Sequence, residues 1–131
     1  MNVKRFGVSL VALFIFVFLF EFLLHGVLLK GIYEQTAHLW RPEGEFKMGF
    51  LVLSQFLFCV MMAFIFTRNY EGKGIGEGAR FGLFMGLLFG AIQVGSYSYM
   101  PIPFTLTIGW VVGGIVEGLG SGIVLSLTYK N

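Results

Sequence analysis

Charged residues are scarce in this chain of 131 residues, and aspartate is missing altogether. Lys, Arg and Glu make up 12% of the residues, whereas a soluble domain carries about a quarter. The formal net charge of +2 is small and dispersed, which argues against a nucleic-acid partner. Because 56% of the residues are hydrophobic and fall into long runs, the composition predicts an integral membrane protein.

Cysteine occurs only once, as Cys59 within an apolar run. An internal disulfide and a cysteine-based metal motif are therefore excluded, and we expect a packed thiol. The G-x-S-x-G motif of serine nucleophiles is also missing, since Gly120-Ser121-Gly122 has the wrong spacing. We expect no catalytic residue, no cofactor and no enzyme activity, with a metal-dependent membrane enzyme kept as an alternative.

Four apolar runs are long enough to cross a hydrocarbon core, which needs about 20 residues of helix. They cover residues 7–29, 48–67, 81–100 and 106–128. The first has 23 residues, longer than the apolar core of a secretory signal, and we interpret it as a retained helix. The sequence thus predicts an all-α membrane protein, in which residues 1–131 form one four-helix transmembrane bundle.

The distribution of Lys and Arg predicts the orientation of this bundle. Six of them lie in the N-terminus, the 68–80 connection and the C-terminus: Lys4, Arg5, Arg68, Lys73, Arg80 and Lys130. The other side holds three: Lys30, Arg41 and Lys47. Because cytoplasmic segments carry the excess of positive charge, we expect both termini in the cytoplasm. The predicted location is the cell membrane, as a multi-pass protein in contact with the lipid bilayer, and a bacterial inner membrane is favoured.

The two longer connections differ in pattern. Residues 30–47 contain apolar residues at helical spacing, which indicates either a continuation of the first helix or a short surface helix that ends before Pro42. A solvated loop with an interfacial Trp anchor is the alternative. Residues 68–80 carry glycine at every second position from 72 to 78 without a phosphate-loop spacing, so we interpret them as a flexible turn.

Glycines recur every fourth residue in the third and fourth predicted helices. The two tracks are Gly82, Gly86 and Gly90, and Gly114, Gly118 and Gly122. Small residues at this spacing let helix backbones approach closely, so these two helices are predicted to form a tight pair. One track could instead serve a homo-oligomer interface or a larger membrane complex.

Each predicted helix also carries a strongly polar residue at nearly the same depth. At about 1.5 Å per residue, Glu21, Gln55, Gln93 and Glu117 fall within one turn of a common level, with His25 about one turn further out. Lipid offers these groups no hydrogen-bond partner, so they should face the bundle interior. Two carboxylates in such a layer cannot both ionise easily, and one should be protonated at neutral pH unless a cation is bound.

Structural roles compete with functional ones for some of these side chains. Gln55 and Gln93 could each make only a helix–helix hydrogen bond, and His25 could be a hydrogen-bonded interfacial residue. Glu21 and Glu117 favour function, because structure alone rarely requires two carboxylates near the midplane of a small protein. Together with His25 they could also ligate a divalent metal, but the layer has no second His and no Glu-x-x-His pair to support this.

The length, the glycine-rich helices and the short polar segment after the first helix resemble those of small, poorly characterised four-helix inner-membrane proteins of bacteria. This resemblance implies a fold but no residue roles. The polar layer favours a proton- or cation-linked carrier or a small-ligand binding protein, with Glu21, His25, Gln55, Gln93 and Glu117 as binding residues. The alternative is an accessory subunit that docks on a larger membrane complex through its glycine-rich and Phe-rich faces.

Overall fold

The structure is a computed structural model that describes residues 1–130. These residues form helices and connections without any strand. The helices are α1 (Val3–Leu23), a π-helical turn (Leu24–Leu28), α2 (Lys30–Gln35), α3 (Met48–Arg68), α4 (Ile75–Ser96) and α5 (Phe104–Thr128), with short 3₁₀ turns at Ala37–Leu39 and Glu43–Glu45. Four stretches are long and apolar enough to span a membrane: Val3–Leu28, Met48–Arg68, Ile75–Ser96 and Phe104–Thr128.

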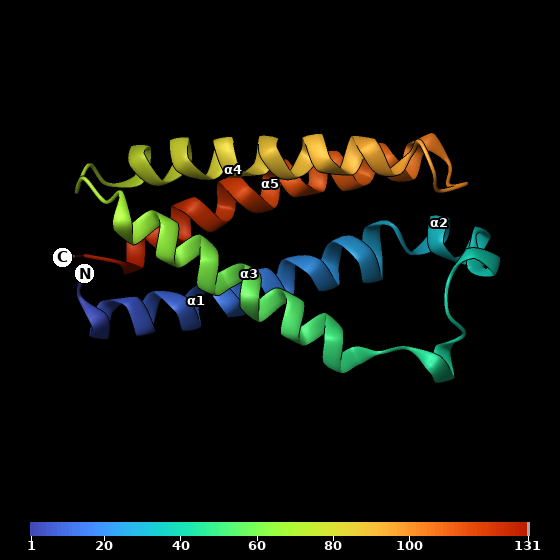
Figure 1. Cartoon of the computed structure of the whole chain (residues 1–131), viewed down its shortest axis with the longest axis horizontal. Helices are drawn as coiled ribbons and strands as arrows, with labels where there is room; N and C mark the ends of the chain where they lie inside the picture. The colour runs from blue at the N-terminus through green and yellow to red at the C-terminus, as the bar shows by residue number, and fades with distance from the viewer. Residues whose placement is uncertain (131) are drawn as a thin grey trace.

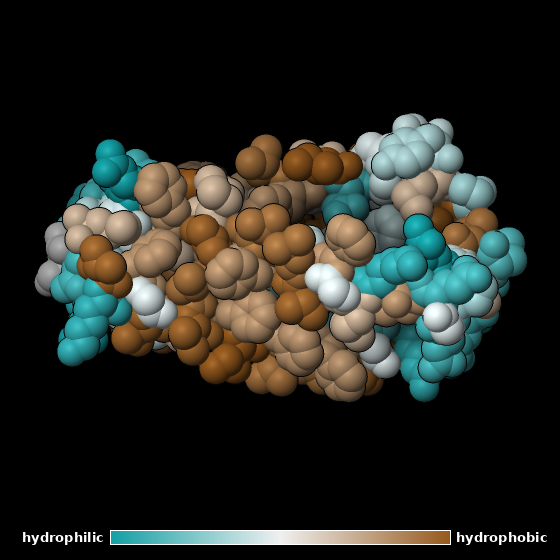
Figure 2. Space-filling model, turned by 60° about the horizontal axis from the view of Figure 1, so that its bottom comes forward, coloured by the Kyte–Doolittle hydropathy of each residue, from teal (hydrophilic) through white to brown (hydrophobic). Residues whose placement is uncertain are grey.

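Both termini lie at one end of the molecule, and α2 lies at the other (Figure 1). The backbone N–H of Asn2 donates to the hydroxyl of Tyr129 at 3.0 Å, which joins the two ends of the chain directly. The visible face in Figure 2 is brown and apolar through its middle and teal at both ends, as expected for a bundle with polar connections. Since α3 has 21 residues, it is about 30 Å long, close to the hydrocarbon thickness of a bilayer.

The predicted start of the third long helix is wrong. The helix begins at Ile75 rather than at residue 81, and it ends at Ser96 rather than at residue 100. Its first turn is held by the Glu77 carboxylate, whose two oxygens accept the backbone N–H groups of Glu71 and Lys73 at 2.7 Å each. The loop interpretation of residues 68–80 therefore holds only up to Gly74, and the later glycines belong to the helix.

Helices α4 and α5 lie against each other along most of their length (Figure 1). A Cβ added to Gly118 would lie 2.6 Å from both the carbonyl oxygen of Gly82 and the Cα of Gly86. Gly78 and Gly122 approach each other's backbone as closely. Only glycine allows this contact, because any side chain would push the two backbones apart.

Two members of the predicted tracks differ from the others. A Cβ on Gly114 would meet only the Cβ of Phe89, at an ordinary 3.8 Å, and one on Gly90 would lie 3.3 Å from a methyl group of Val111. The tight seam is thus shifted toward the end of the bundle that holds the termini, where Gly78 extends it. Toward the other end the backbones of α4 and α5 have more space between them.

Aromatic and aliphatic side chains fill the space between α1, α3 and the C-terminal end of the chain. Leu13 and Val17 of α1 pack with Cys59 and Phe66 of α3 and with Tyr129, and all five are almost fully buried. Cys59 is a free buried thiol, as the sequence predicts. Helices α3 and α4 meet mainly through long side chains, such as the rings of Phe66 and Phe81, whose centroids lie 5.3 Å apart.

The connection between α1 and α3 folds over the end of the bundle that lies opposite the termini (Figure 1). Its first part continues the helical path of α1 through the π-helical turn, α2 and the 3₁₀ turn Ala37–Leu39, so this helical part ends before Pro42, as predicted. Trp40 donates its indole N–H to the Thr36 hydroxyl at 2.9 Å and packs against the ring of Tyr33. A second apolar cluster forms there, with Leu24, Leu29, Ile102 and Leu106 as its buried members.

Candidate functional site

A cavity of about 420 Å³ lies among the four long helices, in the half of the bundle that α2 covers. Its polar lining includes every polar residue of the predicted layer: Glu21, His25, Gln55, Gln93 and Glu117. Its apolar lining includes Phe58 and Phe89, whose ring centroids lie 5.1 Å apart. Cavities of this size commonly hold small organic ligands.

The side chains of Glu21 and His25 lie side by side, as their four-residue spacing predicts. The His25 Nε2 atom is 3.0 Å from a carboxylate oxygen of Glu21. His25 belongs to the π-helical turn, which is closed by the N–H of Leu29 donating to the carbonyl of Leu24 at 2.8 Å. A π-helical turn changes the direction in which side chains project, and such turns are frequent at functional sites.

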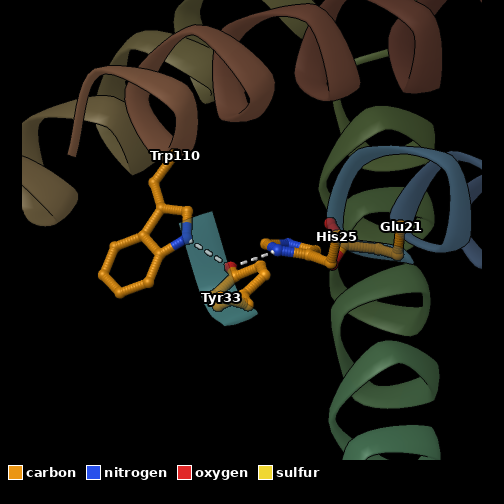
Figure 3. Close-up of polar contacts among 4 residues, drawn as sticks. All are labelled: Glu21, His25, Tyr33 and Trp110. Atoms are coloured by element: carbon orange, nitrogen blue, oxygen red, sulfur yellow. Dashed lines mark hydrogen bonds and ion pairs between the residues drawn. The ribbon is translucent and has the colours of Figure 1, made fainter. Parts of the chain in front are cut away.

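His25 also contacts Tyr33, and Tyr33 contacts Trp110 (Figure 3). The Trp110 indole N–H donates to the Tyr33 hydroxyl oxygen at 2.7 Å, and that hydroxyl lies 2.6 Å from His25 Nδ1. An indole N–H can only donate, so the Tyr33 hydrogen is left to point at Nδ1. His25 then carries its proton on Nε2 and donates it to Glu21. In this arrangement every group in the chain of hydrogen bonds has a partner.

Tyr33 is suited to this donor role. It lies in α2, beyond the end of the first long apolar stretch. Burial raises the pKa of the Tyr33 phenol above its ordinary value, so the hydroxyl keeps its hydrogen at neutral pH. Its ring is held between His25 and Trp40, at centroid distances of 5.7 Å from each.

Glu117 completes the polar chain from the side of α5. It is 8% exposed, and its carboxyl group lines the same cavity as the Glu21 carboxyl group. Two carboxyl groups in one buried site can hydrogen-bond to each other only if one of them holds a proton. A connected set of polar groups therefore runs from Glu117 through Glu21 and His25 to Tyr33.

The two glutamines line the same cavity from the opposite wall. Gln55 of α3 is 9% exposed, and its side-chain oxygen Oε1 has no hydrogen-bond partner among the described residues. Gln93 of α4 is partly buried. Neither side chain forms a helix–helix hydrogen bond within residues 1–130, so the purely structural interpretation of Gln55 leaves its buried oxygen unexplained.

Three lining residues were not anticipated as part of the site: Tyr33, Ser54 and Trp110. In the sequence, Tyr33 and Trp110 lie near the ends of apolar runs, where aromatic residues are common at membrane interfaces. Their hydroxyl and N–H groups reach the site because α2 folds back over the bundle, a contact between positions 77 residues apart. Ser54 directly precedes Gln55 in the sequence, and this neighbourhood is the one local signal that could have identified Ser54 as a lining residue.

The part of the chain that the structure describes does not contain a set of side chains suited to bind a metal ion. Within residues 1–130, no three side chains from His, Cys, Asp and Glu are grouped so that they could hold a metal ion. Both ring nitrogens of His25 are already engaged, one by Tyr33 and one by Glu21. Ligation would require one of these contacts to break.

Comparisons with protein-family models, curated proteins and solved structures find no match to this chain. The class of protein is therefore defined by its own features: an all-helical chain with four membrane-length helices and a polar cavity among them. Function has to be inferred from the chemistry of that cavity.

Proposed function

We propose that this protein is a small multi-pass membrane protein that binds a small ligand in its cavity and exchanges a proton at the Glu21–Glu117 carboxyl pair. It would act as a proton- or cation-linked carrier or as a ligand-binding protein, and not as an enzyme. The placement of both carboxyl groups in the lining of one cavity carries this proposal, because two carboxyl groups in a low-dielectric site can share one proton, which a bound ligand could replace.

The hydrogen-bonded chain supports a route for that proton. His25 joins Glu21 to Tyr33, and Tyr33 lies at the α2 end of the bundle, beyond the apolar stretch. In the tautomer described above, Nε2 could pass its proton to Glu21 while Nδ1 accepts the Tyr33 hydrogen, and Tyr33 would then regain a proton from the aqueous side. A proton leaving the carboxyl pair would follow the reverse of these transfers. Histidine suits such a shuttle because its two nitrogens exchange protons near neutral pH.

The proposed setting is a cell membrane, with both termini in the cytoplasm and α2 on the opposite side. This orientation rests on the six-to-three distribution of Lys and Arg. It would place the Tyr33 end of the polar chain toward the outer aqueous phase. A bacterial inner membrane fits the proposal.

Infrared difference spectroscopy on the full-length protein in lipid tests the shared proton. At neutral pH we expect the carbonyl band of a protonated carboxylic acid, and we expect Glu117→Gln to remove it. Glu43→Gln is the matched control, since the same chemical change falls in the exposed 3₁₀ turn. Absence of the band from the unmodified protein would overturn the proposal.

The accessory-subunit hypothesis predicts a different result. A docking subunit would co-purify with a larger complex in mild detergent, and Glu117→Gln would leave that association unchanged. The cavity gives no support to this alternative, because its polar lining comes from helices of a single chain.

A further inference from the structure

Helices α3 and α4 both line the cavity, and they separate from each other toward the α2 end of the bundle (Figure 1). They make few backbone contacts with each other, and the rings of Phe58 and Phe89 join them at the cavity. Beyond this pair the rim is formed by Leu51 of α3, 40% exposed, and Ile92 of α4, 67% exposed. In a membrane this opening would face the acyl chains of the lipid.

Among the side chains that line the cavity, the Oε1 atom of Gln55 is the buried polar atom that has no partner within residues 1–130, and it is an acceptor. The carboxyl oxygens of Glu21 and Glu117 are further acceptors in the lining. The donors of Trp110, Tyr33 and His25 are already used by one another and by Glu21, whereas the amides of Gln55 and Gln93 can donate as well as accept. A ligand that satisfies the acceptors must therefore bring N–H or O–H donors.

The charge of the residues that line the cavity limits which kind of donor ligand can bind. Two carboxyl groups line the cavity, and neither Lys nor Arg does. An anionic ligand would meet like charge without a Lys or Arg to compensate for it, which is strongly unfavourable in a low-dielectric site. A cation could instead take the place of the shared proton and leave the charge of the site unchanged.

From these observations we propose that the cavity binds an amphipathic amine: a protonated ammonium head with at least one N–H, attached to an apolar body. The head would lie at Glu21, Glu117 and the Oε1 of Gln55, while the body would lie between Phe58 and Phe89 and the apolar rim. Entry occurs from the lipid, between α3 and α4. This inference rests on the proposed function, since the amine displaces the proton of the carboxyl pair.

The displacement balances in protons and charge. The ammonium ion donates N–H hydrogen bonds to the carboxylates and keeps its own proton. The single proton held by the pair leaves for water, so one positive charge enters as another departs. No covalent bond of the ligand forms or breaks.

Four probes that each contain a straight chain of eight carbon atoms separate the possibilities: n-octylammonium, n-octyltrimethylammonium, octanoate and 1-octanol. Each is titrated calorimetrically into the full-length protein in lipid nanodiscs, with empty nanodiscs as the baseline for partitioning into lipid. We expect saturable binding of n-octylammonium, at least about tenfold tighter than that of the trimethyl probe, because the latter has no N–H for Gln55. Octanoate and octanol should give only the lipid baseline.

The released proton provides a second measurement. The n-octylammonium titration, repeated in two buffers of different ionisation enthalpy, should show release of about one proton per ligand at neutral pH. Gln55→Leu should weaken binding about tenfold through loss of the acceptor. Gln35→Leu makes the same change at an exposed position of α2 and should have no effect.

Each outcome supports or overturns the amine proposal. Equal or tighter binding of the trimethyl probe would show that the N–H donors are not recognised. Saturable binding of octanoate or octanol would show that the positive charge of the ammonium head is not recognised. Either result would overturn the proposal. Absence of binding by n-octylammonium would overturn it as well. If the infrared band of the shared proton is present in that case, the amine proposal fails alone; if the band is absent, the proposed function fails with it.

Discussion

The α4–α5 seam and the cavity beside it are built from neighbouring faces of the same helices, yet they differ in nearly every property. In the seam the backbones touch, since a Cβ on Gly118 would lie 2.6 Å from backbone atoms of α4. One turn before Gly118 in α5, Gly114 lines the cavity and has room for a Cβ. The seam is closed by backbone contact, whereas the cavity is bounded by side chains and contains polar groups.

This difference suggests that the α4–α5 seam contributes mainly to stability, whereas the cavity is suited to binding. Polar groups away from water lower stability unless they are paired, and Gln55 keeps an unpaired oxygen in the cavity. The close packing of the α4–α5 seam can offset this loss of stability and hold the walls of the cavity in place. Substitutions in the seam should therefore change stability more than substitutions in the cavity.

Gly118→Ala should cause the largest loss of stability. The new methyl group would overlap the backbone of Gly82 and Gly86, and backbone atoms cannot move aside as a flexible side chain can. We expect a loss of about 3 kcal/mol in the free energy of unfolding, measured by denaturation of the purified protein in detergent. Gly95→Ala in α4 has open space around it and serves as the control. An unchanged free energy for Gly118→Ala would show that the seam is not close-packed.

Glu77→Ala should destabilise the junction between α3 and α4. The substitution leaves the backbone N–H groups of Glu71 and Lys73 without their acceptors, and Glu77 is only 7% exposed. We expect a loss of about 2 kcal/mol, because hydrogen bonds to a charged group contribute more than neutral ones. Glu45→Ala, in the exposed 3₁₀ turn, should change the free energy of unfolding by less than a quarter of that loss.

Tyr33→Phe should alter the hydrogen bonds beside the cavity while leaving the packing of the α4–α5 seam unchanged. It keeps the ring between His25 and Trp40 but removes the hydroxyl, at an expected cost of about 1 kcal/mol. Nitrogen NMR of the His25 ring, in a His38→Gln background, should report the Nε2–H form in the presence of Tyr33 and a mixture of forms in Tyr33→Phe. Tyr99→Phe removes a hydroxyl from an exposed turn and should not alter that spectrum. A mixture already present with Tyr33 would contradict the hydrogen-bond directions inferred here.

Gly114→Ala should have almost no effect on stability, although it lies in the same track as Gly118. Its methyl group would make an ordinary contact with Phe89, and alanine favours the helix, so we expect a gain of about 0.5 kcal/mol. The same methyl group would narrow the cavity. A large destabilisation would mean that the seam extends past the cavity, and the contrast between the two regions would then be lost.

Periodicity and depth counting predict much of the candidate site. The spans place Glu21, Gln55, Gln93 and Glu117 at one level, and the structure brings all four to one cavity together with His25. This agreement has a simple reason: helices of similar length that alternate in direction keep residues of equal depth at equal height. The paired faces of α4 and α5 follow similarly from their glycine spacing.

Prediction from local patterns is less successful where a short contact overrides composition. The glycines at 76 and 78 suggest a flexible turn, yet Glu77 lies in the first turn of α4 and accepts two backbone N–H groups of the preceding loop. Gly114 belongs to a perfect four-residue repeat and nonetheless lines the cavity, whereas the backbone of Ile115 beside it lies against Gly86. Neither the loop contacts of Glu77 nor the direction that Gly114 faces is visible in the spacing of residues along one helix.

The amino-acid sequence is enough to predict four membrane-length helices, a close approach between two of them, and a polar residue from each helix at a shared depth. The packing of these helices brings Glu21 and Glu117 to one cavity and adds Tyr33 and Trp110 to the polar chain beyond His25. The sequence does not show this because it does not fix how each helix is rotated about its axis. Sequence spacing gives the height of a residue along its helix, but the direction in which its side chain points depends on how neighbouring helices pack and on the π-helical turn that precedes α2.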